Sequence, residues 1–261
     1  MSEKTMYNEF SQDYDRFVNW DARLSAEIPF LTAELTTLEN GPGEPVRVLD
    51  AACGTGQHLI ALADQGFVTA GADFSAGMVE KARQNAQAAS HEIPFKEAGF
   101  GELADAFGEG CFDALLCLGN SLPHVLDERT LAETLVDFCQ VLRPGGKLIL
   151  QNRNFDQVMA EHTRWMPPQT YREGDHTWIF ARFYDFDPDG RLTFNIQILY
   201  SQGGEVFQQH VLSTRLWPMT RDLLVNALEK AGFGSLKLYG GLEGSAYNPQ
   251  ESGNLVIIAR A

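Results

Sequence analysis

The sequence predicts an α/β fold in which a doubly wound, mostly parallel sheet carries an inserted antiparallel β cap. First, an apolar strand pattern over 46–49 passes through glycines into a helical pattern over 59–63. Second, strand and helix patterns then alternate up to residue 151, which is typical of parallel βαβ units. Third, from 152 to about 219 the pattern changes to strands of alternating polarity separated by turns, which is typical of antiparallel hairpins.

The chain has 261 residues and can bury a full core. We expect residues 1–152 and 219–261 to form the ligand-binding domain, with an N-terminal helical lid, and residues 153–218 to form an antiparallel substrate cap. Apolar periodicity predicts helices over 7–20, 28–38, 59–65, 75–89, 131–142 and 220–231. Apolar runs and alternation predict strands over 46–50, 67–73, 93–98, 111–118, 147–151, 177–185, 191–201, 205–217, 235–239 and 254–260.

The N-terminal segment interleaves aromatic residues with acids and amides. It is either an amphipathic helix that packs Phe10, Tyr14, Phe17 and Val18 into the core or a lid over the ligand. In the cap, Pro167 and Pro168 are expected to mark a loop, because proline cannot donate to a strand ladder.

Composition narrows the class of protein. Lys and Arg number 20 against 35 Asp and Glu, which gives a formal net charge of −15. An acidic chain repels phosphodiester backbones, so we expect no nucleic-acid partner. The four cysteines form no C-x-x-C pair. Cys117 in an apolar strand pattern and Cys139 in a helical one are interpreted as reduced core thiols of a cytoplasmic protein. No signal peptide, membrane span or metal site is predicted, and the oligomeric state is left open.

The polar residues that follow the predicted parallel strands define a ligand crevice. Gly54 and Gly56 allow a backbone to approach a nucleotide-like ligand closely. Asp73 lies about 20 residues beyond this turn, the spacing at which a carboxylate accepts the ribose hydroxyls; its alternative role is to cap the next helix, although Ser75 can supply that cap. The loop at Gly99 is expected to edge an adenine, on which Phe100 either stacks or simply joins the core.

The cofactor class follows from what surrounds the glycine turn. A dinucleotide fingerprint requires a third glycine where this chain has Leu59, so a nicotinamide-dependent oxidoreductase is disfavoured. The set VLDAACGTG, Asp73, FDALLCLGNS and LRPGGKL, over roughly residues 46–152, resembles the Rossmann-type methyltransferases that use S-adenosyl-L-methionine and release S-adenosyl-L-homocysteine. That resemblance implies that Asp50 and the backbone of Ala52, Cys53 and Gly54 hold the methionine end. We also assign Gly56, Phe74 and Leu118 to the cofactor site.

A narrower resemblance covers more of the chain. The segments YDRFVNWDAR, CLGNSLPHV and QNRNFD are similar to the glycine and sarcosine N-methyltransferases. The resemblance implies that Arg153 grips the carboxylate of an amino-acid substrate, that Asn120 lies on that substrate, and that Arg23 touches the carboxylate of the cofactor. It also matches His124 and, more loosely, Tyr171 to residues near the substrate. The mammalian glycine enzymes have Asn-Trp where this chain has Gly99-Phe100, so the adenine contact is expected to differ.

Each assignment has a purely structural alternative. Arg153 could form an ion pair with an acidic loop, and Asn120 could be a turn residue that bonds its own backbone. His124 could be an ordinary loop histidine, Arg23 could pair with an acid of its own helix, and Tyr171 could serve packing alone.

We therefore hypothesise that the chain is an S-adenosylmethionine-dependent enzyme that N-methylates a small amine bearing a carboxylate, such as glycine, sarcosine or dimethylglycine. Arg153 suits carboxylate binding because its planar fork makes two charge-assisted bonds. The alternatives are methyl transfer to oxygen or carbon of another small metabolite, and a non-catalytic module that binds the cofactor.

Overall fold

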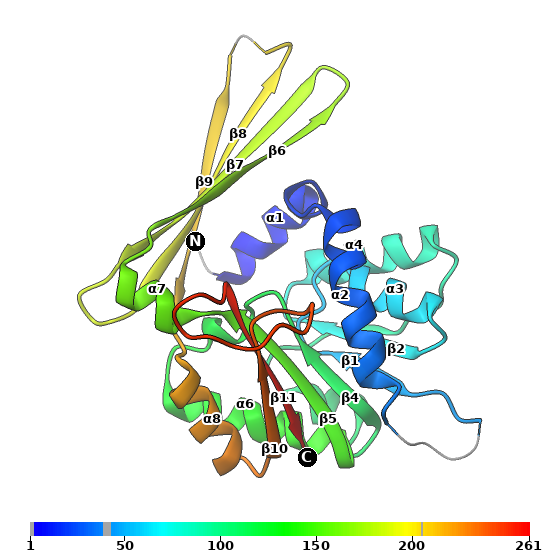
Figure 1. Ribbon diagram of the computed structural model, residues 1–261. Coiled ribbons are helices and arrows are strands. Elements are labelled where there is room, and N and C mark those ends of the chain that lie inside the picture. Colours follow the sequence, from blue (N-terminus) through cyan, green and yellow to red (C-terminus); the bar gives the residue numbers. More distant parts are fainter. Residues whose placement is uncertain (1–2, 39–42, 205) are drawn as a thin grey trace.

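The computed structural model describes residues 3–38, 43–204 and 206–261 (Figure 1). Its helices are α1 (Glu3–Phe17), α2 (Trp20–Leu35), α3 (Gln57–Asp64), α4 (Ala76–Ala88), α5 (Leu103–Phe107), the 3-10 turn η1 (Leu122–His124), α6 (Glu128–Val141), α7 (Phe155–Glu161) and α8 (Arg221–Lys230). Its strands are β1 (Arg47–Asp50), β2 (Val68–Asp73), β3 (Phe95–Glu97), β4 (Phe112–Cys117), β5 (Leu142–Arg153), β6 (Trp165–Glu173), β7 (His176–Phe186), β8 (Leu192–Gln202), β9 (Gln208–Leu216), β10 (Gly234–Tyr239) and β11 (Asn254–Arg260).

The central sheet has seven strands in the order β10-β11-β5-β4-β1-β2-β3. All pairs from β5 to β3 are parallel, and β11 runs antiparallel to both of its neighbours. The strand β4 is buried along its whole length, as expected for a central strand that is covered on both faces. The predicted fold class, a mostly parallel doubly wound sheet with a separate antiparallel sheet, is confirmed.

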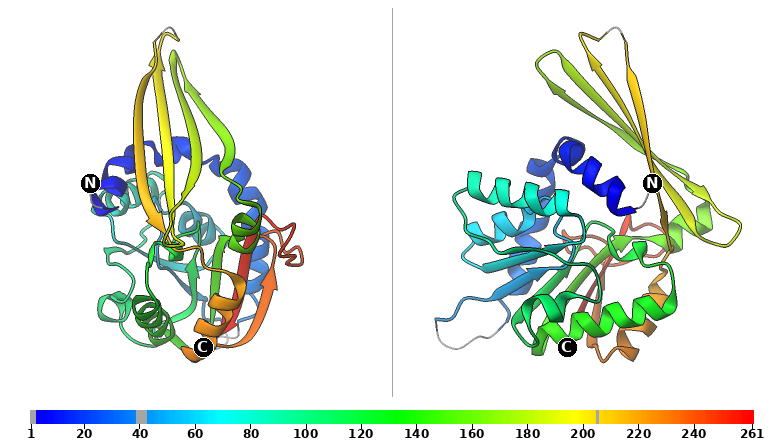
Figure 2. Two further views of the ribbon diagram at one scale, coloured as in Figure 1. Left: turned by 90° about the vertical axis from the view of Figure 1, so that its left-hand side faces the viewer. Right: turned by 180° about the vertical axis from the view of Figure 1, so that it is seen from behind.

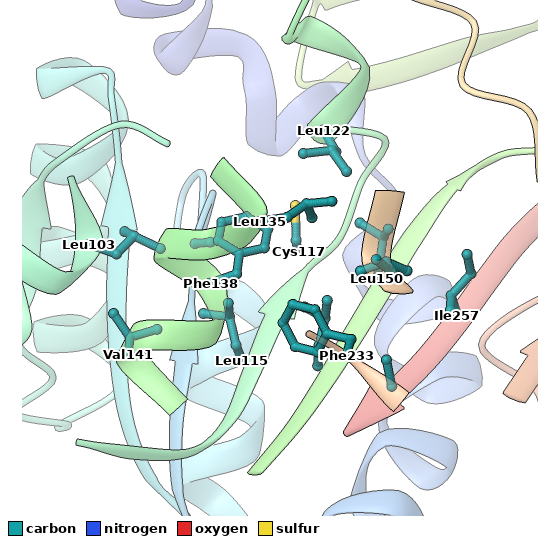
Figure 3. Packing of buried hydrophobic residues seen from close by; sticks show 14 of the residues in the cluster. Leu103, Leu115, Cys117, Leu122, Leu135, Phe138, Val141, Leu150, Phe233 and Ile257 are labelled. Carbon is teal, nitrogen blue, oxygen red and sulfur yellow. The ribbon is translucent and has the colours of Figure 1, made fainter. Parts of the chain in front are cut away.

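Helices cover both faces of the central sheet. On one face, Leu135 and Phe138 of α6 pack with Leu115 and Cys117 of β4 and with Leu150 of β5 (Figure 3). On the other face, α2 and α3 pack against alternate residues of the same strands. Because successive strand residues point to opposite faces, the two cores share one backbone, and the carboxyl ends of the strands stay open to a ligand.

The second sheet has four antiparallel strands in the order β6-β7-β8-β9. It projects from the central domain, and α1 lies between the two sheets (Figures 1 and 2). Phe10 of α1 packs with Phe180 and Leu212 of this sheet. The helix α1 therefore joins the cap to the strand ends of the central sheet.

The structure corrects the predicted loop at Pro167 and Pro168. Both prolines lie within β6, where the register against β7 shifts between Met166 and Gln169. The strand β6 is at the edge of its sheet, and an edge strand tolerates proline at such an irregularity because one side of its backbone has no ladder partner.

Some predicted boundaries were also wrong. The second helix begins at Trp20 rather than at residue 28, because the Asn19 side chain accepts a hydrogen bond from the backbone N–H of Ala22 and caps it. The short helices α5 and α7 were not predicted. The ninth strand is seen over Gln208–Leu216; its predicted start at residue 205 lies outside the described residues.

No helix in the described ranges is long and apolar enough to span a membrane.

Candidate active site

A cavity of about 700 Å³ lies between the carboxyl ends of the central strands, helix α1 and the antiparallel sheet. Predicted site residues that line it are Arg23, Ala52, Gly54, Asp73, Phe74, Gly99, Phe100, Asn120, His124 and Arg153. Predicted site residues outside its lining are Asp50, Cys53, Gly56, Leu118 and Tyr171.

The glycine turn forms the floor of one end of the cavity. Gly54 has a φ of +53°, a conformation that favours glycine. The backbone N–H of Gly54 donates to Oδ2 of Asp73 at 2.9 Å, and that of Cys53 donates to the carbonyl of Ala72 at 2.8 Å. The turn after β1 is thereby fixed to the end of β2.

Two buried carboxylates flank this turn. Oδ1 of Asp50 accepts from the N–H of Ala52 at 3.2 Å, and burial raises the pKa of Asp50 to about 7. Asp73 accepts from the N–H groups of Ser75 and Gly54, both at 2.9 Å, and burial raises its pKa to about 6. Ser75 caps α4 with its own hydroxyl, so the alternative role considered for Asp73 is filled by another residue.

Three predicted cofactor residues point into the protein core. Cys53 packs with the α3 and α4 core, and burial raises the pKa of its thiol. A Cβ on Gly56 would come within 3.0 Å of the Phe95 ring, so this glycine serves close packing of the turn. Leu118 belongs to the core beneath α2.

Helix α1 covers the same end of the cavity. A Cβ at Gly54 would lie 3.5 Å from the ring of Tyr14, and the hydroxyl of Tyr7 lies 3.0 Å from Nε2 of His124. Oδ1 of Asn8 accepts from the backbone N–H of Gly77 in α4 at 3.0 Å. The aromatic N-terminal segment therefore packs into a core, as one interpretation had it, and also lines the cavity; its role as a lid stays a prediction.

Arg23 lines the cavity and is also paired within its own helix. Its Nε donates to both carboxylate oxygens of Glu27 at 3.1 Å, and Nε2 of His58 lies 2.6 Å from Glu27 Oε2. Burial favours a raised pKa for Glu27, but the hydrogen bond from His58 and the charge of Arg23 lower it overall. Glu27 therefore stays ionised and orients the Arg23 guanidinium.

Asn120 ties the loop after β4 to the end of β5. It has a φ of +66°, which asparagine tolerates better than most residues. Its Oδ1 accepts from the backbone N–H of Arg153 at 2.9 Å, and its own N–H donates to the carbonyl of Gln151 at 3.2 Å. Asn120 is thus a turn residue, as one alternative had it, but its side chain holds the neighbouring strand rather than its own backbone.

The Arg153 side chain lines the cavity next to the cap. Its Nε is buried and has no hydrogen-bond partner among the described residues, and none of their carboxylates forms an ion pair with Arg153. The alternative of a structural ion pair with an acidic loop is therefore unsupported in that part of the chain. Arg153 also interacts with the side chain of Tyr184, but its buried Nε donor remains without a partner among the described residues, which is costly unless a ligand supplies one.

Sequence reasoning missed the residues that the cap contributes. Arg182 and Tyr184 of β7 and Gln169 of β6 line the cavity, whereas Tyr171 does not; it is 37% exposed and its ring lies against Trp178. The alternation of side chains along β7 could have indicated them, because it places Arg182 and Tyr184 on the same face of the strand as buried aromatic residues. Burial raises the pKa of Tyr184, and the charges of Arg153 and Arg182 oppose that rise.

Comparison with known proteins agrees with this geometry. The family described as "Methyltransferase domain" matches residues 48–146. The glycine/sarcosine N-methyltransferase of Aphanothece halophytica is 32% identical over 231 residues, which is 88% of this chain and 80% of that protein. The enzyme of the same name from Halorhodospira halochloris is 30% identical over the same shares. An S-adenosylmethionine-dependent methyltransferase from Clostridium acetobutylicum has the same fold, with a TM-score of 0.77 at 16% identity, covering 97% of this chain and 98% of that one.

The sheet order, the glycine turn and the two strand-end acids define an S-adenosylmethionine-dependent methyltransferase. Within that class the chain belongs to the family of the glycine/sarcosine N-methyltransferases.

Proposed function

We propose that this methyltransferase transfers the methyl group to the nitrogen of a small amino-acid-like acceptor, with glycine, sarcosine and dimethylglycine as first candidates. The observation that carries the proposal is the Arg153 guanidinium, which reaches the cavity with a buried and unpartnered Nε. A planar guanidinium matches a carboxylate with two charge-assisted hydrogen bonds. The relatives named glycine/sarcosine N-methyltransferase, about 30% identical, support the same acceptor class.

The residues at the opposite end of the cavity fit the cofactor. S-adenosylmethionine supplies a methyl group on a positively charged sulfur. Asp73 would accept the ribose hydroxyls, Asp50 would favour the cationic methionine end, and Arg23 would bind the carboxylate of the cofactor. Gly54 leaves space for close backbone approach, and Phe100 edges the adenine side. A cationic ligand that also carries a carboxylate needs acids near its positive charge and an arginine at its carboxylate. This end of the cavity supplies both.

The acceptor end depends on the cap. We infer that residues 153–218 act as a substrate cap, because Arg182, Tyr184 and Gln169 complete the cavity wall around Arg153. Holding the acceptor carboxylate at this wall confines its amine to the remainder of the same cavity. Such positioning supplies much of the rate of a displacement between two bound molecules, so a strong protein base is not required when the amine binds neutral.

The assay uses the purified chain with S-adenosylmethionine and each of the three amines, and measures product by mass spectrometry. We expect a methylated amine from at least one of them. Arg153→Ala should raise KM for the acceptor about 10- to 100-fold, the loss expected for a charge-assisted pair, while the affinity for S-adenosylmethionine stays unchanged. The matched control is Arg172→Ala, an exposed arginine of β6 outside the cavity.

Three outcomes contradict the proposal. Binding of S-adenosylmethionine without turnover of any amino acid indicates a non-catalytic module. A methyl group found on oxygen or carbon of another metabolite moves the chain to a different acceptor class. An unchanged KM in Arg153→Ala removes the carboxylate clamp.

A further inference from the structure

A second arginine reaches the acceptor end of the cavity. Arg182 of β7 lines it together with Arg153, and its Nε is buried with no hydrogen-bond partner among the described residues. Arg153 comes from the end of β5 in the central sheet. Two guanidinium groups from different sheets therefore meet in one cavity, each with a buried donor left unused.

The carboxylates of the cavity do not neutralise this pair. Two acidic residues, Glu27 and Asp73, are among the described residues that line it. Glu27 already binds Arg23 and His58, and Asp73 already accepts two backbone N–H groups. Both acids also belong to the end of the cavity assigned to the cofactor.

The contacts that Arg182 does make leave its charge uncompensated. Its guanidinium lies 5.1 Å from the centre of the Phe17 ring, and one terminal nitrogen donates to the carbonyl of Pro167 at 3.3 Å. A ring face and a carbonyl orient a guanidinium, but neither supplies a negative charge. Burial, and after it the charge of Arg153, lowers the pKa of Arg182, which is the direction expected for a cation placed beside another cation.

We propose that Arg182 is a second anion-binding residue and that the preferred acceptor is a small amine carrying two carboxylates, one held by Arg153 and the other by Arg182. The inference rests on the proposed N-methylation with Arg153 as carboxylate clamp, and it replaces a monocarboxylate by a dicarboxylate as the best substrate. The methyl group would still go to the amine nitrogen, so Arg182 decides specificity.

Matched pairs of acceptors test the proposal on the wild-type protein. Iminodiacetate is sarcosine with its methyl group replaced by a second acetate arm, and aspartate is alanine with an added carboxylate. We expect kcat/KM to be about 10- to 100-fold higher for the dicarboxylate of each pair, the gain of one charge-assisted bond. Equal values, or a preference for the monocarboxylate, would overturn the inference and leave the proposed function standing.

Variants of Arg182 test whether this residue causes the preference for dicarboxylates. Arg182→Gln should remove the preference by lowering kcat/KM, chiefly through KM, at least about tenfold more for the dicarboxylates than for the monocarboxylates. Arg182→Lys keeps the charge and should retain part of the preference, whereas Arg172→Gln, the exposed arginine of β6, should retain all of it. Equal loss for mono- and dicarboxylates in Arg182→Gln would show a structural role and contradict the proposal.

A binding measurement separates failure of the inference from failure of the proposed function. If no amino acid is methylated, the proposed function fails, and calorimetry in the presence of S-adenosylhomocysteine decides the role of Arg182. Iminodiacetate that binds at least tenfold more tightly than sarcosine, and loses that margin in Arg182→Gln, supports the two-anion site. Equal or undetectable binding of both overturns it.

Discussion

The bond from Asn120 to the backbone of Arg153 gives a prediction that couples stability to acceptor binding. In Asn120→Ala, the N–H of Arg153 loses the acceptor that it has at 2.9 Å, which costs about 1–2 kcal/mol for a partly buried group. Alanine must also adopt the φ of +66° that asparagine tolerates, which costs about 1 kcal/mol more. Asn120→Ala should therefore lower the free energy of unfolding by about 2–3 kcal/mol.

Two further variants at this position separate the contributions. Asn120→Gly relieves the backbone strain but still lacks the acceptor, so it should cost about 1–2 kcal/mol. Asn120→Asp keeps an acceptor and the tolerance for positive φ, so it should unfold close to the wild-type temperature. In a thermal melt, Asn120→Ala should unfold about 5–10 °C lower than wild type, at about 2–4 °C per kcal/mol for a chain of this size.

Acceptor kinetics complete this test. Because Asn120 holds the end of β5 from which Arg153 projects, Asn120→Ala and Asn120→Gly should both raise the acceptor KM severalfold while S-adenosylmethionine affinity changes little. Wild-type melting temperatures for both variants would refute the importance of this bond. A glycine variant less stable than the alanine variant would refute the argument from φ.

Three other predictions concern the rest of the molecule. Burial raises the pKa of Asp73 to about 6 and of Asp50 to about 7. Because both carboxylates gain negative charge as pH rises, S-adenosylmethionine should bind about tenfold more tightly at pH 8 than at pH 5.5. Calorimetry should show a flatter pH profile of this affinity for Asp73→Asn. A Cβ at Gly71 would meet side-chain atoms of three packed neighbours at 2.7, 2.8 and 2.9 Å, so Gly71→Ala should lose about 1–3 kcal/mol in urea unfolding; wild-type stability would show that the packing yields. Nζ of Lys147 is buried against Oε2 of Glu34 at 2.6 Å, so Lys147→Ala should cost about 3 kcal/mol, and adding Glu34→Ala should restore part of it; no recovery in the double variant would contradict a buried-charge penalty.

The parallel part of the fold was predictable because its signals are local. A buried strand such as β4, a glycine turn after β1 and a serine cap before α4 each act within a few residues. The edge strand β6 escaped prediction because two prolines are read locally as a loop, and only its position at the sheet edge makes them acceptable. Likewise, the start of α2 depended on one capping side chain, that of Asn19.

The candidate site, too, was predictable from the sequence only in part. Asp73, Asn120 and Arg153 follow strand ends, and topology alone brings strand ends together at one edge of a sheet. No such rule applies to the cap residues, because the sheet face that lines the cavity depends on how the second sheet packs against the central domain. Tyr171 was chosen from the cap on a loose family resemblance and does not line the cavity, whereas Arg182 and Tyr184, which do line it, were missed.

Helix α1 has a consequence for the order in which the molecule assembles. Its partners lie far along the chain: Lys4 pairs with Glu97, and Phe10 packs with Phe180 and Leu212 of the cap. Because α1 is synthesised well before these partners, the apolar face of α1 stays unpartnered until both sheets have formed. Docking of α1 is thus a late step of biogenesis, because Leu212 of β9 is among the residues that its apolar face packs against.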